Sequence, residues 1–214
     1  MTLLSFPARG GLSRALLTLF ALVLALAAAP AFAQEAPDAM VKRVSAEVIA
    51  TIKSDPKIQA GDEARIREVM EAKLVPNFDF ARMTSLAMGR NWKSATPEQQ
   101  KRLADEFQTL LVRTYSSALN KYRDETIDTK PLKVAPGETE VTVRTVVIRP
   151  AGSPVQIDYS LEQTPSGWKA YDVIVGGVSL VTNYRDEFNE QVKRGGVDGL
   201  LKTLADKNKG PGTK

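Results

Sequence analysis

Residues 155–175, VQIDYSLEQTPSGWKAYDVIV, are the stretch that decides the fold class. In its first half the apolar side chains alternate with polar ones, at Val155, Ile157, Tyr159 and Leu161. This alternation is typical of an antiparallel strand with one buried face and one face in solvent. Pro165-Ser166-Gly167 predicts a tight turn. Residues 168–175 predict a second strand with large side chains on both faces, which we expect at the centre of the sheet.

Two further strands are predicted upstream of this stretch. Residues 127–134 are followed by Pro136-Gly137, and residues 141–148 end at Pro150-Ala151-Gly152. Short connections between consecutive strands favour an antiparallel meander, in which each strand pairs with the one before it. The sequence therefore predicts a curved sheet of roughly four antiparallel strands.

Helical spacing of apolar residues precedes and follows these strands. The predicted helices cover residues 38–54, 62–74, 79–88 and 96–122 before the sheet, and 179–192 and 197–207 after it. The helix from residue 96 is the clearest, because Thr96-Pro97-Glu98-Gln99 is a capping box and one apolar stripe follows it. Such a stripe needs a broad surface to cover. The fold class is therefore α+β, with the helices packed on one face of the sheet.

Helix-capping and helix-breaking residues between the elements support this division of the chain. We expect Asp38, Asp62 and Asp79 to be helix caps rather than metal ligands, and Ser179 to cap the helix after the last strand. Gly195-Gly196 should interrupt the final helix. Residues 34–207 are predicted to form a single domain, and residues 208–214 (NKGPGTK) a disordered tail.

The N-terminus has the layout of an export signal. Arg9 and Arg14 precede the uncharged apolar run 15–29, and Ala31-Phe32-Ala33 is a small-x-small cleavage site. We expect residues 1–33 to be a signal peptide cleaved after Ala33, which places the mature chain in the periplasm. An uncleaved anchor is the alternative, although the apolar run is short for a membrane span.

Composition excludes several classes of protein. The 214 residues include no histidine and no cysteine, so neither a Ser-His-Asp triad nor a Cys/His zinc site can form. Removal of Arg9 and Arg14 with the signal leaves 27 basic residues against 25 acidic ones. This small excess is spread along the chain, so we expect no binding to nucleic acid.

The sequence contains only weak candidates for a catalytic motif. Gly177-Val178-Ser179 begins like a nucleophile elbow, but no histidine exists to activate the serine. Asp158 and Asp172 could lie on neighbouring strands and share a metal or a proton. Strand carboxylates more often face solvent or pair with Arg or Lys, so we predict no catalytic residue and no metal site. The many large apolar side chains either fill a core or enclose an apolar pocket, and composition does not separate these readings.

Residues 167–185, GWKAYDVIVGGVSLVTNYR, resemble one family. It is the MlaC or toluene-tolerance family, the periplasmic phospholipid carriers of the maintenance of lipid asymmetry (Mla) pathway. The resemblance continues in other segments, at Phe188, 196–200, Asp79-Phe80, 88–92 and the helix 96–115. Gly176 departs from the family pattern, because a bulkier and often acidic residue is expected there.

The resemblance implies a carrier that performs no chemistry and shuttles phospholipids between outer and inner membranes. The phospholipid would be cargo, not a cofactor, with its acyl chains in a pocket between sheet and helices and its headgroup in solvent. The implied partners are an outer-membrane lipoprotein–porin complex and an inner-membrane ABC transporter contacted through its ring-forming substrate-binding protein. Two alternatives remain: a cone-shaped α+β enzyme using sheet Asp and Tyr residues, and an interaction-only periplasmic adaptor.

Strand alternation and the helix stripe give a predicted lining for this pocket. The lipid-binding residues would be Phe107, Leu111 and Tyr115 on the long helix, and Val147, Tyr159, Val173 and Val175 on the sheet. Gly176 and Gly177 join the last strand to the next helix, and glycine adopts backbone angles that other residues resist. We expect this corner to be a hinge for lipid entry. If it does not move, the mouth of the pocket would lie at the segment 78–92.

Overall fold

The computed structural model describes residues 34–119, 125–150 and 152–209. The described residues from Glu35 onward belong to one compact unit. The predicted signal peptide, its cleavage after Ala33 and the last five residues of the predicted tail lie outside the described residues. No helix in the described ranges is both long enough and apolar enough to cross a membrane.

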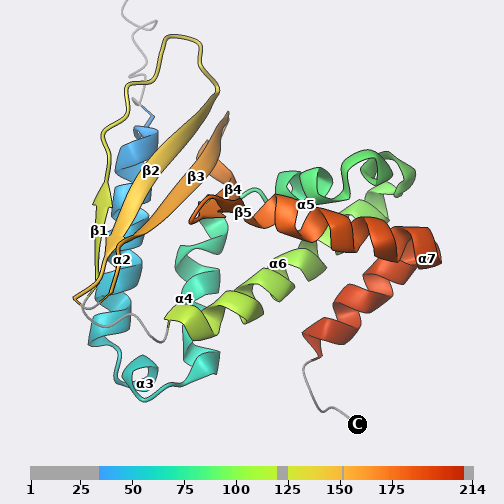
Figure 1. The fold of residues 1–214 in the computed structure, drawn as a ribbon, viewed down its shortest axis with the longest axis horizontal. Helices are drawn as coiled ribbons and strands as arrows, with labels where there is room; N and C mark the ends of the chain where they lie inside the picture. The colour runs from blue at the N-terminus through green and yellow to red at the C-terminus, as the bar shows by residue number, and fades with distance from the viewer. Residues whose placement is uncertain (1–33, 120–124, 151, 210–214) are drawn as a thin grey trace, which may run out of the picture. The chain divides into compact units, whose positions relative to one another are not determined.

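Helices make up the first part of the described chain (Figure 1). In order they are α2 (Pro37–Ser54), α3 (Pro56–Gln59), α4 (Glu63–Lys73), the 3₁₀ turn η1 (Val75–Asn77), α5 (Phe80–Met88), the 3₁₀ segment η2 (Gly89–Ser94) and α6 (Pro97–Leu119). The predicted capping box is present, because Thr96 and Gln99 each bond the other's backbone N–H through their side chains. The structure describes α6 only to Leu119, so the predicted end at residue 122 lies outside the described residues.

Side-chain caps begin α4 and α5 as expected. The carboxylate of Asp62 accepts from the backbone N–H of Arg65 at 3.0 Å, and that of Asp79 from Arg82 at 2.7 Å. Asp38 is different and corrects the prediction. It lies inside the first turn of α2, and its Oδ2 accepts from the backbone N–H of Leu132 at 3.2 Å, so it ties the helix to the segment after β1.

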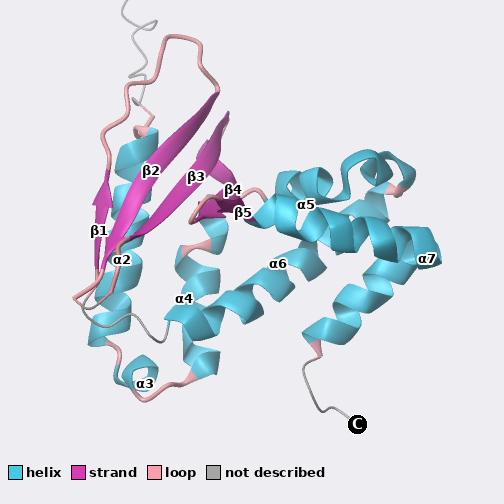
Figure 2. Cartoon of the chain, in the orientation of Figure 1, coloured by secondary structure: helices cyan, strands magenta, loops and turns pink. Residues whose placement is uncertain are grey.

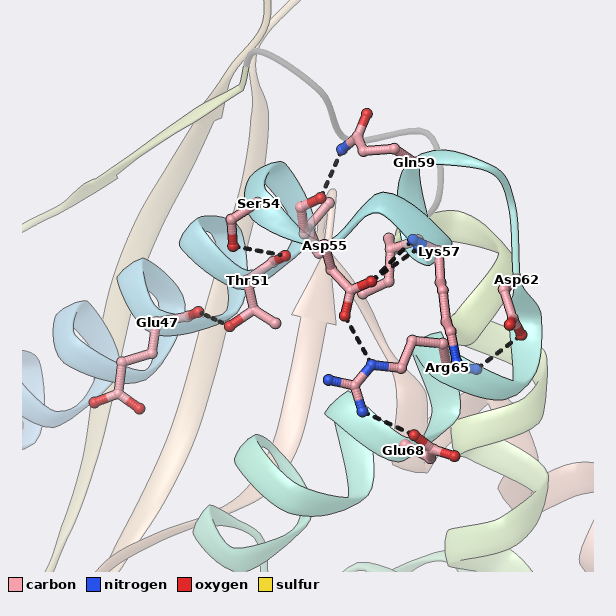
Figure 3. Close-up of polar contacts among 11 residues, drawn as sticks. Glu47, Thr51, Ser54, Asp55, Lys57, Gln59, Asp62, Arg65 and Glu68 are labelled. Atoms are coloured by element: carbon pink, nitrogen blue, oxygen red, sulfur yellow. Dashed lines mark hydrogen bonds and ion pairs between the residues drawn. The ribbon is translucent and has the colours of Figure 1, made fainter.

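The corner between α2 and α4 is held by one aspartate (Figure 3). The Asp55 carboxylate accepts from the backbone N–H groups of Lys57 and Ile58 at the start of α3, and from Nε of Arg65 in α4 at 2.7 Å. These bonds, above all that from Arg65, lower the pKa of Asp55. The Gln59 amide closes the corner by donating to the carbonyl of Ile52. This corner orients α4 so that α4 packs against α6.

The sheet has five antiparallel strands in chain order (Figure 2). They are β1 (Thr126–Thr129), β2 (Glu140–Ile148), β3 (Val155–Thr164), β4 (Gly167–Val175) and β5 (Val178–Ser179). The α+β class and the antiparallel meander are therefore confirmed, and β5 adds a short fifth strand to the roughly four expected. β1 is shorter than predicted because Lys130 makes the last backbone bond to β2 before Pro131, which has no N–H to donate.

The expectation that residues 168–175 form a central strand is wrong. β4 lies next to the edge, and only its last two residues pair with β5. Its large side chains on both faces result from a bulge, because Ser160 pairs with Asp172 while Leu161 pairs with Ala170. The extra residue, Tyr171, shifts the alternation of the side chains. The inward-facing residues have even numbers before it (Trp168 and Ala170) and odd numbers after it (Val173 and Val175).

Two of the three hydrophobic clusters among the described residues contact the sheet. One face of β2, β3 and β4 packs on α2, with a core of Met40, Val41, Val44, Val141, Val143, Leu161, Trp168 and Ala170. The other region joins α5, α6 and α7 (Leu180–Asn208), where the rings of Phe107, Tyr184 and Phe188 meet at centroid distances of 5.0 to 5.8 Å. The helices predicted at 179–192 and 197–207 are the two halves of α7, kinked at Gly196 with φ 66°.

The open edge of β4 is covered by the segment before α5. Phe78 bridges Ala170 in parallel, and the backbone N–H of Asp79 donates to the Ala170 carbonyl at 2.8 Å. This contact gives the edge strand a partner where β5 is too short to reach. It also holds Phe78 and Phe80 beside the inner face of the sheet.

Candidate functional site

An apolar cavity of about 350 Å³ lies between the sheet and the helices. Its sheet wall is Ile157, Tyr159, Val173 and Val175, and its helical wall is Met70, Leu74, Val75, Phe78, Phe80, Met83, Leu111, Val112, Tyr115 and Leu180. This size is within the range of small-molecule sites, roughly 300–1,000 Å³. The cavity is lined by the same types of side chain that fill the core.

Strand register explains the sheet wall. Tyr159 pairs with Val173 and Ile157 pairs with Val175, so all four side chains lie on the inner face of β3 and β4. The bulge at Tyr171 is what turns Val173 and Val175 inward. Without that extra residue the end of β4 would present Asp172 and Ile174 to the cavity.

Burial distinguishes this wall from the core on the same face of the sheet. Val143 and Val147 of β2 are 0% and 1% exposed, whereas Ile157, Tyr159 and Val173 keep intermediate exposure. All five face the same side, because Val143 pairs with Tyr159 and Val147 with Val155. The difference arises because helix α2 packs on β2, while part of the wall of β3 and β4 faces a hollow.

Five of the predicted lining residues border the cavity together: Leu111, Tyr115, Tyr159, Val173 and Val175. Phe107 and Val147 do not line it, which corrects our assignment of them. Phe107 is wholly buried against Tyr184 and Phe188, because its position one turn before Leu111 faces α7. Val147 belongs to the buried part of β2.

Most of the cavity wall between α4 and α5 could not be recognised from sequence patterns. Leu74, Val75 and Phe78 lie in and around a short 3₁₀ turn, where neither helical nor strand periodicity exists to assign a face. Phe80 and Met83 are on α5, whose amphipathic pattern does not reveal which helix or strand it will meet. The only earlier signal was the suggestion that the segment 78–92 borders the pocket mouth.

The cavity wall carries no ionisable carboxylate, lysine or arginine among the described residues. Its titratable groups are tyrosines. Burial, and then the neighbouring Tyr184, raises the pKa of Tyr115, so its hydroxyl stays neutral throughout the physiological range. The wall can therefore hold apolar material and has no charged acid–base pair facing it.

The two strand carboxylates lie elsewhere and have structural partners. Asp172 accepts from the backbone N–H groups of Val173 and Val181 and from the Ser179 hydroxyl at 2.5 Å, so it holds the start of α7 against β4. Ser179 in turn caps α7, as predicted. Asp158 accepts from the Gln156 amide at 2.8 Å. No three His, Cys, Asp or Glu residues in the described ranges gather closely enough to hold a metal ion.

Gly176 and Gly177 form a two-residue turn between β4 and β5. Both have positive φ, 58° and 87°, as the type I′ hairpin turn requires. A Cβ added at either position would meet nothing within 4 Å. The backbone N–H of Gly176 also donates to the Gln156 carbonyl at 2.9 Å. The two glycines thus form the turn that connects β4 to β5, and their role as a hinge stays a prediction.

An arginine anchors α5, one wall of the cavity, to the sheet. Arg82 forms ion pairs with Glu140 on β2 at 2.7 Å and with Glu162 on β3. Its guanidinium lies 3.7 Å from the ring centre of Tyr171, whose hydroxyl donates to Glu140. The bond from Arg82 lowers the pKa of Glu140, and burial raises that of Tyr171. The bulge at Tyr171 therefore also supplies a platform for this arginine.

Comparisons with known proteins agree on one group of relatives. The family model described as MlaC protein matches residues 42–206. The toluene tolerance protein ttg2D of Pseudomonas putida is 27% identical over 186 residues, 86% of each chain. The intermembrane phospholipid transport system binding protein MlaC of Haemophilus influenzae is 22% identical over 185 residues, 85% of this chain and 86% of its own. A phospholipid-binding protein from Ralstonia solanacearum, solved in complex with a phospholipid, has a TM-score of 0.76 and 41% identity, covering 82% of this chain and 98% of that one.

Proposed function

The chain belongs to the MlaC family, and we propose that it is a phospholipid-binding transport protein that holds acyl chains in the cavity between sheet and helices. The observation that carries the proposal is the apolar cavity itself, walled by β3, β4, α4, η1, α5, α6 and the start of α7. The Ralstonia relative, which shares the fold and 41% of its residues, holds a phospholipid.

The energetics suit a carrier without an energy source of its own. Each acyl CH₂ removed from water is worth about 0.8 kcal/mol, so a diacyl lipid in water carries a cost on the order of tens of kcal/mol. An apolar cavity removes most of that cost, as a bilayer does. Transfer from bilayer to cavity is then close to balanced, and small changes in cavity shape can decide between loading and release.

Mass spectrometry of solvent extracts from the purified mature protein tests this function. We expect phospholipid close to one molecule per chain, without added lipid. The matched control is a Val173→Trp variant, in which the indole fills the cavity, so it should yield much less phospholipid. A wild-type protein that is folded and free of lipid would contradict the proposal and favour an adaptor or an enzyme.

The finer assignments rest on family membership. We propose that the protein works in the periplasm after cleavage at Ala33, and that it exchanges lipid with an outer-membrane lipoprotein–porin complex and an inner-membrane ABC transporter. The contact with the transporter would be made through its ring-forming substrate-binding protein. Fluorescent-lipid transfer between vesicles that contain each purified complex tests these partners, and transfer equal to that from protein-free vesicles would refute them.

We propose that the protein performs no chemistry and needs no cofactor, the phospholipid being cargo. Support comes from the cavity wall, whose titratable groups are tyrosines, and from Asp172, whose oxygens are occupied by Ser179, Val173 and Val181. Turnover of a lipid ester or a steroid by the purified protein would favour the enzyme alternative.

A further inference from the structure

A second hollow borders the apolar cavity on the side of α5. This outer cleft has a volume of about 690 Å³ and is open to solvent. It shares Val75, Phe78 and Phe80 with the cavity, so these three side chains form the wall common to both. The rings of Phe78 and Phe80 stack with their centres 5.8 Å apart.

The outer cleft differs from the cavity in chemistry. Its remaining walls come from the N-terminal half of α6, from Trp92 and from the turn between β3 and β4. These walls combine apolar residues (Ala81, Trp92, Pro97 and Ala104) with polar and charged ones: Gln100, Lys101, Asp105, Gln108, Thr164, Ser166 and Lys169, with Asp79 beside the shared wall. An apolar cavity that adjoins a solvent-open cleft with charged and polar side chains on its walls matches the two ends of a phospholipid.

Two of the four charged side chains in the outer cleft are cations, and only one of these cations has an ion-pair partner among the described residues. Lys101 binds Asp105 at 2.7 Å, and the Asp79 carboxylate caps α5. Lys169 is half-buried and forms no ion pair with any residue in the described ranges; its ammonium group donates to the carbonyl of Pro76, beside the shared wall.

The carboxylate on the strand position paired with Lys169 already forms an ion pair with another residue. Glu162 stands opposite Lys169 on β3, but it is bound by Arg82. Two of the three donor positions of the Lys169 ammonium are therefore left for a ligand beyond its bond to Pro76. Lys169 is thus the cation of the outer cleft that has no carboxylate partner in the described ranges, which suits it to contact a phosphate; Asp79 contributes a carboxylate to the same cleft.

We infer that the outer cleft binds the phosphate of the lipid headgroup and that Lys169 is its charged contact. The lipid would pass the shared wall of Val75, Phe78 and Phe80 with its acyl chains in the cavity and its phosphate in the cleft. This inference rests on the proposed function and refines it, because the headgroup is solvated yet held at a defined position.

The test compares lipids with and without a phosphate. Purified mature wild type and the Lys169→Gln variant are titrated with a phospholipid and with a diacylglycerol of the same acyl chains. Glutamine keeps a donor for the Pro76 carbonyl and removes the charge. We expect Lys169→Gln to weaken phospholipid binding about three-fold, as one partly exposed ion pair should, and to leave diacylglycerol binding unchanged.

Two further variants are the matched controls. Lys169→Arg keeps the charge and should bind phospholipid like the wild type. Lys133→Gln removes the same charge from an exposed position outside both hollows and should have no effect. Melting temperatures of all four proteins identify any loss that comes from unfolding.

Each outcome bears on a different claim. Equal loss of phospholipid and diacylglycerol binding in Lys169→Gln, or no loss of either, would overturn the role of Lys169. A wild type that binds neither lipid would instead refute the proposed function. Glycerol 3-phosphate alone should not bind measurably, because the acyl chains supply most of the affinity; binding without chains would assign the cleft to a free phosphate and overturn the headgroup site.

Discussion

Val173 faces the hollow between sheet and helices, so a larger side chain there has space to enter. Val147 is on the same face of the sheet but is 1% exposed and surrounded by packed atoms. Interiors as dense as this one resist added volume, whereas a cavity accepts it. For a single residue, the effect of a larger side chain therefore depends on whether the residue faces packed side chains or the cavity.

A matched pair of substitutions tests that division. Val173→Trp should sharply reduce the phospholipid bound per folded molecule while changing the melting temperature little, because the indole occupies cavity volume. Val147→Trp should cost about 1–3 kcal/mol of stability through overpacking and leave bound lipid per folded molecule unchanged. Lipid content by mass spectrometry and thermal unfolding measure both. The opposite pattern would exchange the roles of the two valines.

Asp172 provides a test of chemistry against structure. Asp172→Asn keeps one carbonyl oxygen but removes the acceptor of the Ser179 hydroxyl, so stability should fall by about 1 kcal/mol. Lipid retention should persist, and Asp158→Asn should retain lipid as well. Chemical denaturation and retained lipid are the measurements. A loss of lipid without a loss of stability in Asp172→Asn would show that this carboxylate acts on the cargo.

At the scale of elements, the cavity is defined by how β4 ends. The bulge at Tyr171 turns Val173 and Val175 inward, and the Gly176-Gly177 turn then folds β5 back along β4. Asp172 and Ser179 hold the start of α7 at this point. Arg82 holds α5, the opposite wall, to β2 and β3. The two sides of the cavity are thus fixed by separate polar contacts.

The predicted hinge is tested at the glycine turn. Asparagine tolerates positive φ, and Asn-Gly is a preferred type I′ turn, so Gly176→Asn should keep the turn while restricting its other conformations. If the corner moves during lipid entry, exchange with liposomes should slow several-fold at unchanged melting temperature and equilibrium loading. Gly176→Ala is the control for strain, since an alanine at φ 58° should cost about 1 kcal/mol. Unchanged exchange in Gly176→Asn would place the mouth at the segment 78–92.

At the scale of the whole molecule, cargo and stability are coupled. A ligand that binds only the folded state stabilises it by about 2.7 kcal/mol when present at about 100 times its Kd. The lining of the cavity is split between the sheet and the helices α4, α5, α6 and α7, so a lipid held there would bridge elements that are far apart in the sequence. The loaded protein should therefore be the more stable form.

Removal of the lipid provides the measurement. The delipidated wild type should melt at a lower temperature than the loaded protein and should recover when phospholipid is added back. The Val173→Trp variant, whose cavity is filled by its own side chain, should show a much smaller difference between the two conditions. Equal melting temperatures for loaded and delipidated wild type would mean that the cargo contacts too little of the fold to couple to it.

Local patterns were enough to predict most elements of this protein. Alternation along residues 155–161, the capping box at Thr96 and the turn residues between strands act over a few positions, so they can be read without the fold. The family also followed from the sequence, through the motif at 167–185. Leu111 and Tyr115 could be assigned to the cavity because they lie one turn apart on the apolar stripe of α6.

Tertiary structure decided which apolar residues enclose the cavity and which fill the core. Phe107 and Leu111 are one helical turn apart on the same stripe, yet one packs on α7 and the other borders the cavity. Val147 and Val173 are both inward-facing valines on strands. The physical reason is that burial and cavity lining use the same apolar chemistry, so only the positions of α2, α5 and α7 determine where side chains meet and where a hollow remains. The bulge at Tyr171 is equally non-local, because an extra residue exists only in relation to the partner strand.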